Sequence, residues 1–456
     1  MADESTETSV STGPLSRLRT VARTDGPYLL VLLLGAILIT SLFASRYTKI
    51  GPVDELQHID YAQKASRGHI VAVGEKFGEP AMREEACRGI DAAFQPPPCD
   101  AAVLAPEVYQ EAGFNTAAPH PPLYYVATGI GARLLSALPG VDSFVTGARL
   151  MGGIWLALGL IISWYLLAEL GLSKQVRLGI CLTMATIPLV AYSAATVNND
   201  ALALAAGAST LLVTLRYIRG RTHWIWLTVV AAVVMTIRAT NLVALMLCCL
   251  VLLLATRTTE RRPGISLKQA IIGIGAIGAS SVLAVGAWVA ISTSRTVYPP
   301  EKIPMSQRFR VDSIGFETFL SNVLNGAPPT ADHYWPAAFA SSWIVLWTGL
   351  IGFAIIAGAV GSALEGSATP LRFQLGSATA LAMLATGPLF VAIGFIQGHG
   401  YAPPPPRYGM SLIPACLACF ALCLGTRKAR FIAPVAAACG FALIVGVLMN
   451  GPIAPL

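Results

Sequence analysis

Charged residues are scarce in this chain: Asp, Glu, Lys and Arg make up only 12% of its 456 residues, whereas 55% are hydrophobic. No soluble domain of this length needs so much apolar surface, so a soluble globular protein is excluded. The chain also lacks a stripe of Lys and Arg interleaved with aromatic residues, so its net charge of +7 does not indicate nucleic-acid binding. The composition instead predicts an all-α integral membrane protein with many spans.

Apolar runs of about 20 residues, the length that a straight helix needs to cross a bilayer, recur along the chain. The first, at 28–45, follows an Arg-bearing tail over 1–27. It is longer than a signal-peptide core and has no convincing cleavage site, so we expect an uncleaved anchor. We predict eleven spans in a single membrane domain over 28–456. The other ten lie at 149–171, 176–197, 200–217, 222–237, 239–256, 269–292, 339–361, 374–396, 408–425 and 431–449.

The stretch 121–138 is ambiguous, because it is apolar enough to cross but carries Arg133. If it does not cross and the N-terminus is cytoplasmic, the basic clusters fall on the cytoplasmic side, as the positive-inside rule demands. We therefore predict that 121–138 is a juxtamembrane helix, that the C-terminus is exoplasmic, and that the long loops 46–148 and 293–338 are exoplasmic. The basic clusters are Arg17, Arg19, Arg23, Lys174, Arg177, Arg216, Arg219, Arg221, Arg257, Arg261, Arg262, Lys268, Arg372, Arg427, Lys428 and Arg430.

The first exoplasmic loop begins with two adjacent carboxylates, Asp54 and Glu55. Pro52 can open a helix in which Asp54 and His58 lie one turn apart on the same face. Carboxylates and an imidazole at a membrane surface indicate acid/base chemistry on a substrate that the bilayer delivers. The alternative is a pair of solvated acids, or charges that stabilise a helix N-terminus.

Two more polar clusters fall on the same predicted face. Three prolines surround His120 and stiffen the chain that leads through Tyr124 into the juxtamembrane helix. Asn198, Asn199 and Asp200 lie at the outer turn between the third and fourth spans, where they could hydrogen-bond sugar hydroxyls or ligate a hard cation. The alternatives are an aromatic-belt anchor for the first cluster and a helix cap for the second.

Two arginines lie at outer span ends. Arg238 lies at the outer end of a hairpin, and Arg407 and Tyr408 follow four prolines, which favour a stiff polyproline II segment. A guanidinium at the lipid boundary suits a phosphate, which it can bind bidentately; a snorkelling anchor is the alternative. All these polar clusters fall on the same side of the membrane in a topology that was chosen from other residues. Unrelated polar residues in the loops would have no reason to fall on one side.

Cysteine is nearly absent from the loops. Seven of the nine cysteines lie in or beside apolar spans, where they pack as small core residues. Only Cys87 and Cys99 lie in an outer loop. On the oxidising side of the membrane we expect them to pair.

The ordered set of motifs resembles the GT-C superfamily of polyprenyl-phosphate-sugar-dependent membrane glycosyltransferases. The motifs are Asp-Glu after the first span, His-Pro-Pro-Leu-Tyr-Tyr, Asn-Asp opening the fourth span, and Arg-Tyr entering a late span. The resemblance implies a GT-C-like bundle with juxtamembrane helices in a long first exoplasmic loop. It also implies a polyprenyl-phosphate sugar donor and an acidic base in that loop, which maps onto Asp54, with Glu55 as the fallback. Many relatives carry a large soluble C-terminal domain, which this sequence lacks, so we do not expect such a domain to recognise a polymeric acceptor.

The chemistry is coherent on the residues alone. A polyprenyl-phosphate sugar carries its own leaving group, so the enzyme must deprotonate an acceptor hydroxyl and stabilise the departing phosphate. We expect Asp54 to be the base, Arg407 and Arg238 to bind the phosphate, and in-line attack to invert the anomeric carbon. The remaining substrate contacts are assigned to Glu55, His58, His120, Tyr124, Asn198, Asn199, Asp200 and Tyr408.

No cofactor is required on this scheme, no metal site is assigned, and a divalent cation is left open. The expected partners are the lipid-linked donor, membrane lipid, and an envelope glycan, glycolipid or protein acceptor. An Arg- and Ala-rich composition suggests a GC-rich bacterial genome, and with it the bacterial plasma membrane.

Two rival functions remain. A flippase or transporter would place ionisable groups in mid-membrane and often show repeated halves, whereas these spans are almost free of interior charge. A lipid-linked glycan ligase or polymerase would share the donor chemistry but move a chain instead of one sugar.

Overall fold

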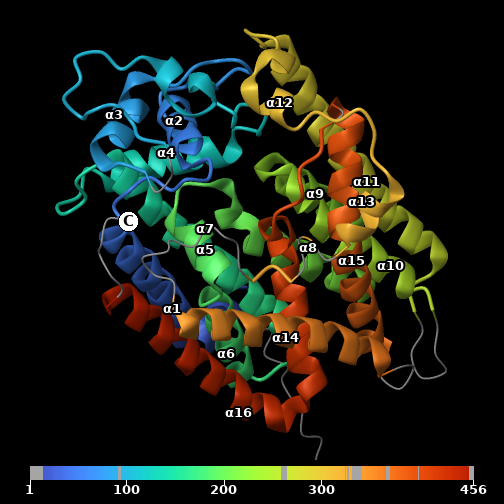
Figure 1. Ribbon diagram of the computed structural model, residues 1–456. Helices are drawn as coiled ribbons and strands as arrows, with labels where there is room; N and C mark the ends of the chain where they lie inside the picture. The colour runs from blue at the N-terminus through green and yellow to red at the C-terminus, as the bar shows by residue number, and fades with distance from the viewer. Residues whose placement is uncertain are drawn as a thin grey trace, which may run out of the picture.

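The computed structural model describes residues 14–90, 94–257, 264–323, 325, 328–330, 341–365, 370–398 and 400–450, with backbone only for 14–23, 425 and 426. Helices dominate these ranges, and the only β pairing within them is three isolated bridges (Figure 1). The prediction of an all-α membrane protein is confirmed.

The element bounds follow the apolar pattern of the sequence. The helices are α1 (Pro14–Arg46), α2 (Glu55–Ala65), α3 (Glu79–Arg88), α4 (Leu123–Leu135), α5 (Phe144–Glu169), α6 (Lys174–Ala185), α7 (Pro188–Ala195), α8 (Ala203–Ile218), α9 (Trp224–Ile237), α10 (Leu242–Leu254), α11 (Leu267–Ser294), α12 (Pro304–Arg308), α13 (Phe316–Ser321), α14 (Ser342–Leu364), α15 (Pro370–Gly398) and α16 (Ile413–Asn450). Short 3-10 helices are η1 (Pro106–Val108), η2 (Gln110–Gly113), η3 (Asn199–Leu202), η4 (Ala239–Asn241), η5 (Pro300–Lys302) and η8 (Pro406–Leu412).

Within the described ranges, eight helices are long and apolar enough to cross a membrane, or nine if the bent pair α6–α7 is one span. The two remaining predicted spans, 222–237 and 239–256, correspond to the shorter apolar helices α9 and α10. The chain is therefore a multi-pass membrane protein, with a helix at each position where the apolar runs predict one.

Two predicted spans differ from a straight crossing. The span at 176–197 bends by 67° between α6 and α7. Pro188 opens α7, and because proline lacks an N–H and disfavours helical geometry at the preceding residue, the helix breaks at Ile187. The bend carries the chain from α7 into η3, where the Asn-Asn-Asp motif lies.

The last two predicted spans correspond to Pro406–Leu424 and Arg427–Asn450, each long and apolar enough to cross a membrane, although α16 runs through both without an intervening loop. α16 continues through the basic residues 427–430, which were expected to form a cytoplasmic turn. Arg, Lys and Ala are good helix formers, and no proline interrupts this stretch. At the other end of the chain, α1 begins at Pro14, so the tail predicted over 1–27 is helical from that residue onward, while 1–13 lie outside the described residues.

The segment between α1 and α5 folds into a layer of its own, here called the cap, which contains α2, α3 and α4. These helices lie together at the upper left of Figure 1, above α1. α4 packs against α2 within this layer and against α5 of the bundle. The expected bond between Cys87 and Cys99 is present and closes the loop after α3.

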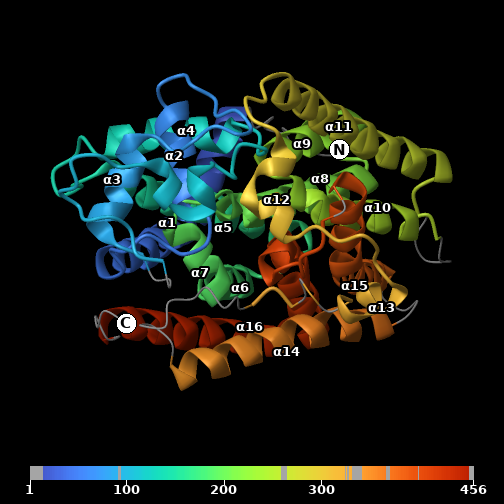
Figure 2. The same ribbon diagram turned by 45° about the horizontal axis from the view of Figure 1, so that its top comes forward.

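The segment after α11 lies against the cap, and in both overall views α12 is beside it (Figure 2). The Val297 N–H donates to the Val73 carbonyl oxygen at 2.9 Å, and Arg308 forms an ion pair with Glu111 at 3.0 Å. The two longest loops of the chain therefore share one end of the helical bundle, and the space between them is where a site can form.

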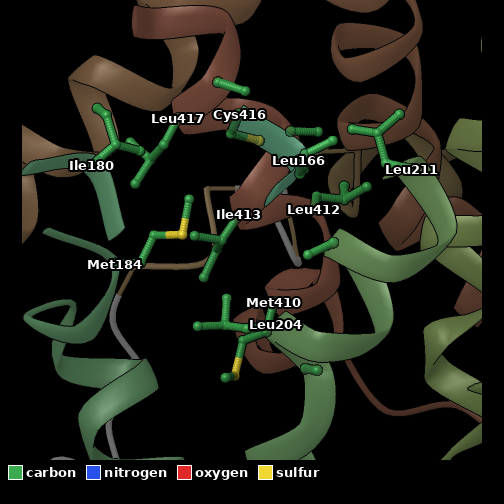
Figure 3. Close-up of a cluster of buried hydrophobic side chains, with 14 of the residues drawn as sticks. Leu166, Ile180, Met184, Leu204, Leu211, Met410, Leu412, Ile413, Cys416 and Leu417 are labelled. Atoms are coloured by element: carbon green, nitrogen blue, oxygen red, sulfur yellow. The ribbon is translucent and has the colours of Figure 1, made fainter. Parts of the chain in front are cut away.

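The apolar core lies beneath this end of the bundle. Figure 3 shows Leu166 of α5, Met184 of α6 and Leu204 of α8 converging on Met410 and Ile413 around the start of α16. The packing fixes η8 against its neighbours. At one contact, a Cβ on Gly207 of α8 would lie 1.8 Å from the Ser411 carbonyl oxygen, so only glycine allows η8 to approach this closely.

Candidate active site

Two adjoining cavities lie between the cap and the bundle. The outer cavity has a volume of about 810 Å³ and the inner pocket about 260 Å³. They share the wall that contains Asp54, Arg407 and Tyr408. Eight predicted site residues line the inner pocket: Asp54, His58, His120, Asn198, Asp200, Arg238, Arg407 and Tyr408. Residues far apart in the sequence are thus brought together.

Asp54 lies at the junction of the two cavities. It is the residue before α2, with left-handed backbone angles (φ 56°, ψ 7°), a conformation that Asp and Asn tolerate better than most other side chains. Its carboxylate makes no capping hydrogen bond and is 44% exposed. The Arg407 Nη2 atom lies 3.3 Å from Asp54 Oδ2. The carboxylate is therefore accessible from both cavities and touches a guanidinium.

The two arginines converge on the inner pocket from different elements. Arg238 follows α9, forms a close ion pair with Asp200, and donates from Nη1 to Asn199 Oδ1 at 2.8 Å. Arg407 lies in η8 with its Nε 3.8 Å from Asp200 Oδ2. Both guanidiniums lie within 6.0 Å of the Tyr408 ring centroid, a cation–π arrangement. Two arginines and two aspartates, Asp54 and Asp200, therefore line the inner pocket, and each guanidinium has a carboxylate partner.

The two histidines of the inner pocket are uncharged at neutral pH, and His58 is buried whereas His120 is half-buried. Their rings stack with centroids 6.0 Å apart, and His58 Nδ1 lies 2.8 Å from the hydroxyl oxygen of Tyr125. Burial, reinforced by the charges of Arg238 and Arg407, lowers the pKa of His120 to about 3. Burial and the same positive neighbours also hold the pKa of His58 well below its usual value. Both rings can therefore exchange hydrogen bonds with a ligand without adding charge.

Glu55 does not face either cavity. Its side chain is 1% exposed, and Oε1 accepts from Arg149 Nε and from the Val197 N–H, both at 2.9 Å. Oε2 accepts from Arg149 Nη2 at 2.8 Å and from the Gly51 N–H at 2.6 Å. A Cβ on Gly51 would lie 2.7 Å from the Tyr192 hydroxyl, so this approach needs glycine. Four donors fully occupy the carboxylate, which leaves it no lone pair directed at a substrate.

Two more predicted site residues lie behind the wall of the inner pocket. Tyr124 is 1% exposed and packs edge-on against Tyr125, with ring centroids 5.2 Å apart. Asn199 is 1% exposed and supports Arg238 from behind. Their positions suit them to support residues that line the pocket, and neither contacts the space inside it.

The sequence reasoning missed Arg149 and Tyr125. Arg149 is 1% exposed at the start of α5, and besides Glu55 it donates to the Tyr47 and Lys49 carbonyl oxygens, both at 2.6 Å. A basic residue at the predicted outer end of a span, against the positive-inside bias, was the available signal. Tyr125 stacks on Tyr61 of the cap. Nothing in the spacing of the sequence distinguishes Tyr125 from the adjacent Tyr124.

Comparisons with known proteins identify the fold. A family described as predicted membrane protein (DUF2142) matches residues 105–327, and no curated protein matches the chain. The structure is similar to ArnT from Cupriavidus metallidurans bound to undecaprenyl phosphate, with 14% identity and a TM-score of 0.50 over 88% of this chain and 60% of ArnT. An oligosaccharyltransferase from Archaeoglobus fulgidus gives 13% identity and a TM-score of 0.48 over 95% of this chain and 57% of that protein.

At this identity the likeness concerns the fold. The chain has the multi-pass GT-C type of fold that its motifs led us to expect. It spans about 60% of the length of ArnT.

Proposed function

We propose that this protein is a glycosyltransferase that moves one sugar from a polyprenyl-phosphate donor to an acceptor hydroxyl. The observation that carries the proposal is the junction of the two cavities, where Asp54 contacts Arg407 and is open to both sides. A transfer reaction needs a base that reaches the acceptor and a positive group that receives the leaving phosphate, and here the two are neighbours. The fold, shared with a protein bound to undecaprenyl phosphate, supports a lipid-linked donor.

The inner pocket suits the phosphate of the donor. Arg238 and Arg407 face it, and Asp200 is the single buried carboxylate between them. Since His58 and His120 are neutral, the positive charge available to a phosphate comes from the two guanidiniums, which bind phosphate oxygens bidentately and keep their charge at any physiological pH. A phosphate in this pocket would take the place of Asp54 beside Arg407 and release the carboxylate for proton transfer.

The reaction then balances without further reactants. Asp54 accepts the proton of the acceptor hydroxyl, and the hydroxyl oxygen forms a bond to the anomeric carbon. The bond between that carbon and the phosphate oxygen breaks, and polyprenyl phosphate departs with its electron pair towards Arg407 and Arg238. Attack from the side opposite the leaving group inverts the anomeric configuration.

We assign Glu55 a positioning role in place of the fallback base. Through hydrogen bonds, Glu55 and Arg149 connect the chain just after α1, the N-terminal part of α5, the start of α2 and Val197. Asp54 directly precedes Glu55 in the chain, and Asn198 directly follows Val197. The buried ion pair therefore sets the distance between opposite walls of the inner pocket.

The scheme requires no cofactor. In the described part of the chain, no three His, Cys, Asp or Glu side chains come together in a way that could hold a metal ion. The proposal rests on the two guanidiniums, which supply the positive charge that a metal would otherwise provide to a phosphate. Activity with and without a chelator measures whether a divalent cation contributes.

We place the reaction on the exoplasmic face of a bacterial plasma membrane, with a cytoplasmic N-terminus, in envelope glycan assembly. The positive-inside distribution supports this orientation. A ligase or polymerase that transfers a preassembled chain would use the same donor chemistry, and the size of the transferred group separates the two reactions.

Cells with and without the protein provide the test. Loss of the protein should remove one sugar from an envelope glycan and raise the amount of a polyprenyl-phosphate sugar in the exoplasmic leaflet. Wild type and Asp100→Asn, which changes an exposed carboxylate of the same loop, should restore the sugar, whereas Asp54→Asn should not. Full restoration by Asp54→Asn, or accumulation confined to the cytoplasmic leaflet, would instead favour a flippase.

A further inference from the structure

The outer cavity is a second compartment with its own chemistry. It is roughly three times the volume of the inner pocket and reaches Asp54 from the other side. Its volume is in the range of cavities that enclose small-molecule ligands. If the donor phosphate occupies the inner pocket, the acceptor reaches the base through the outer cavity. The residues that line the outer cavity therefore indicate which class of acceptor binds there.

The charges of the outer cavity cancel within its own walls. Four charged residues line it, and they form two pairs: Arg407 with Asp54 at 3.3 Å, and Arg308 with Glu111 at 3.0 Å. Before donor binds, a phosphate or carboxylate on the acceptor would find no surplus cation here, and an ammonium group no surplus anion. The cavity therefore favours an uncharged ligand, because desolvating an unpaired charge is costly.

The remaining walls combine amides with flat apolar surfaces. Gln57, Gln110 and Asn325 contribute side-chain amides, and Phe94, Phe309 and the proline run 403–406 contribute rigid apolar faces. An amide both donates and accepts hydrogen bonds, as a hydroxyl does, so the two groups are complementary. Rings and prolines offer flat surfaces for the C–H face of a sugar ring.

One of these amides is held in a fixed orientation. Gln110 Nε2 donates to both oxygens of Glu85, at 3.0 and 2.9 Å, so its Oε1 is turned away from that carboxylate. Gln110 Oε1 and Glu111 Oε2 have no hydrogen-bond donor among the described residues. Both oxygens are buried against protein atoms, so the orientation of the Gln110 amide rests on its two hydrogen bonds to Glu85.

We propose that the outer cavity binds a neutral sugar unit, and that the acceptor is therefore the uncharged end of a glycan. This inference rests on the proposed glycosyltransferase function and specifies its second substrate. Neutral charge balance, amides and flat apolar walls all match a pyranose. An anionic lipid headgroup lacks a counter-charge here, and a folded protein is too large for the cavity.

Binding can be measured on the full-length protein in nanodiscs without any donor. The probes are neutral methyl glycosides of mannose, glucose and galactose, the anionic methyl glucuronide, and a Ser/Thr-containing peptide, each followed by saturation-transfer NMR. Phe309→Ala removes one flat wall of the cavity. Phe316→Ala is the matched control, because Phe316 is 74% exposed and lies outside both cavities.

We expect at least one neutral glycoside to bind wild type and Phe316→Ala alike, and to bind Phe309→Ala on the order of tenfold more weakly, the loss that an aromatic contact and its buried area produce. Phe309→Tyr, which keeps the ring, should restore binding. Preferred binding of the glucuronide or the peptide, equal binding by Phe309→Ala, or no glycoside binding at millimolar concentrations would overturn the proposal.

A donor-side variant separates this inference from the proposed function. Arg238 lines only the inner pocket, so Arg238→Ala should leave glycoside binding unchanged while weakening binding of a polyprenyl-phosphate sugar. If wild type binds neutral glycosides in a manner that depends on Phe309 but transfers no sugar from any lipid-linked donor, the cavity assignment stands and the function fails. Transfer to a peptide or an anionic acceptor in place of a neutral glycan keeps the function and overturns the cavity assignment.

Discussion

Replacing Glu55 with Gln separates a structural clamp from a catalytic base. The substitution keeps the shape of the side chain and removes its charge. Because Glu55 and Arg149 are each 1% exposed, the change leaves the Arg149 guanidinium buried without its counter-charge. The same substitution would also disable Glu55 if it were the base, so stability and turnover must be measured together.

The magnitude follows from the hydrogen bonds. Glu55 accepts four, two at each oxygen, and all four come from buried donors or from Arg149. Gln keeps one oxygen and presents an NH₂ group to the donors at the other, so two bonds are lost. At about 1.5–3 kcal/mol for each bond to a charged group, the loss is about 3–6 kcal/mol. Breaking a buried ion pair typically costs about 3–5 kcal/mol, in agreement.

The assay compares denaturant-induced unfolding of purified variants in detergent, followed by tryptophan fluorescence. Glu84→Gln is the matched control, since Glu84 pairs with Arg88 at 2.8 Å in the same cap but near the surface, where such pairs contribute about 0–1 kcal/mol. The double variant Glu55→Gln with Arg149→Met removes the stranded charge and should recover part of the lost stability. In the double variant we expect kcat to fall while the KM for donor changes little, because the inner pocket keeps Arg238 and Arg407.

A different pattern would refute the reasoning. If Glu55→Gln unfolds like Glu84→Gln while sugar transfer falls a hundredfold or more, Glu55 takes part in the chemistry and the clamp interpretation fails. Equal destabilisation by the single and double variants would show that the stranded charge of Arg149 is not the cause.

Three further outcomes are expected. Arg407→Ala should weaken donor binding by about 10- to 100-fold, the worth of a charge-assisted hydrogen bond, whereas the exposed control Arg310→Ala should not; equal donor affinity in equilibrium binding would remove Arg407 from the phosphate site. The paired Cys87→Ser and Cys99→Ser change should cost about 3 kcal/mol, because it releases a loop of 12 residues in the unfolded chain, and unchanged unfolding under non-reducing conditions would contradict this. Burial, reinforced by the nearby charge of Glu55, raises the pKa of Glu85 from 4.5 to about 7, so the folded state holds a proton there that the unfolded state releases. The free energy of unfolding should therefore fall as pH rises from about 4.5 to 7, and Glu85→Gln should flatten this fall. Parallel pH profiles of melting temperature for wild type and Glu85→Gln would refute this prediction.

The sequence predicts the helices well because apolar length is a local property. The bend at Pro188 and the continuous α16 depend on backbone detail that hydropathy averages away. The polar clusters of the loops could be predicted to lie near one another only from the membrane topology. Topology places segments on the same side of the membrane but gives no distances between them. The structure supplies the 3.3 Å contact between Asp54 and Arg407, residues more than three hundred positions apart.

The adjacent carboxylates show what the sequence could not resolve. Asp54 and Glu55 are chemically alike and one position apart, yet one is exposed to both cavities and the other is buried. The left-handed backbone at Asp54 and the partner Arg149 cause the difference, and neither is visible in local sequence. The outer cavity was also beyond prediction, because its amides and aromatic rings come from segments with no shared motif.

Transfer by Asp54→Asn tests the central claim most directly. Asn tolerates the left-handed backbone of this position and keeps the size of the side chain, so the variant should fold and bind donor as wild type does. The measurement is release of labelled sugar from a polyprenyl-phosphate donor to an acceptor by the purified protein, with donor binding measured separately. We predict that turnover falls by about 10²–10⁴-fold, the usual contribution of a general base, with donor affinity retained. Near wild-type turnover in Asp54→Asn would contradict the account.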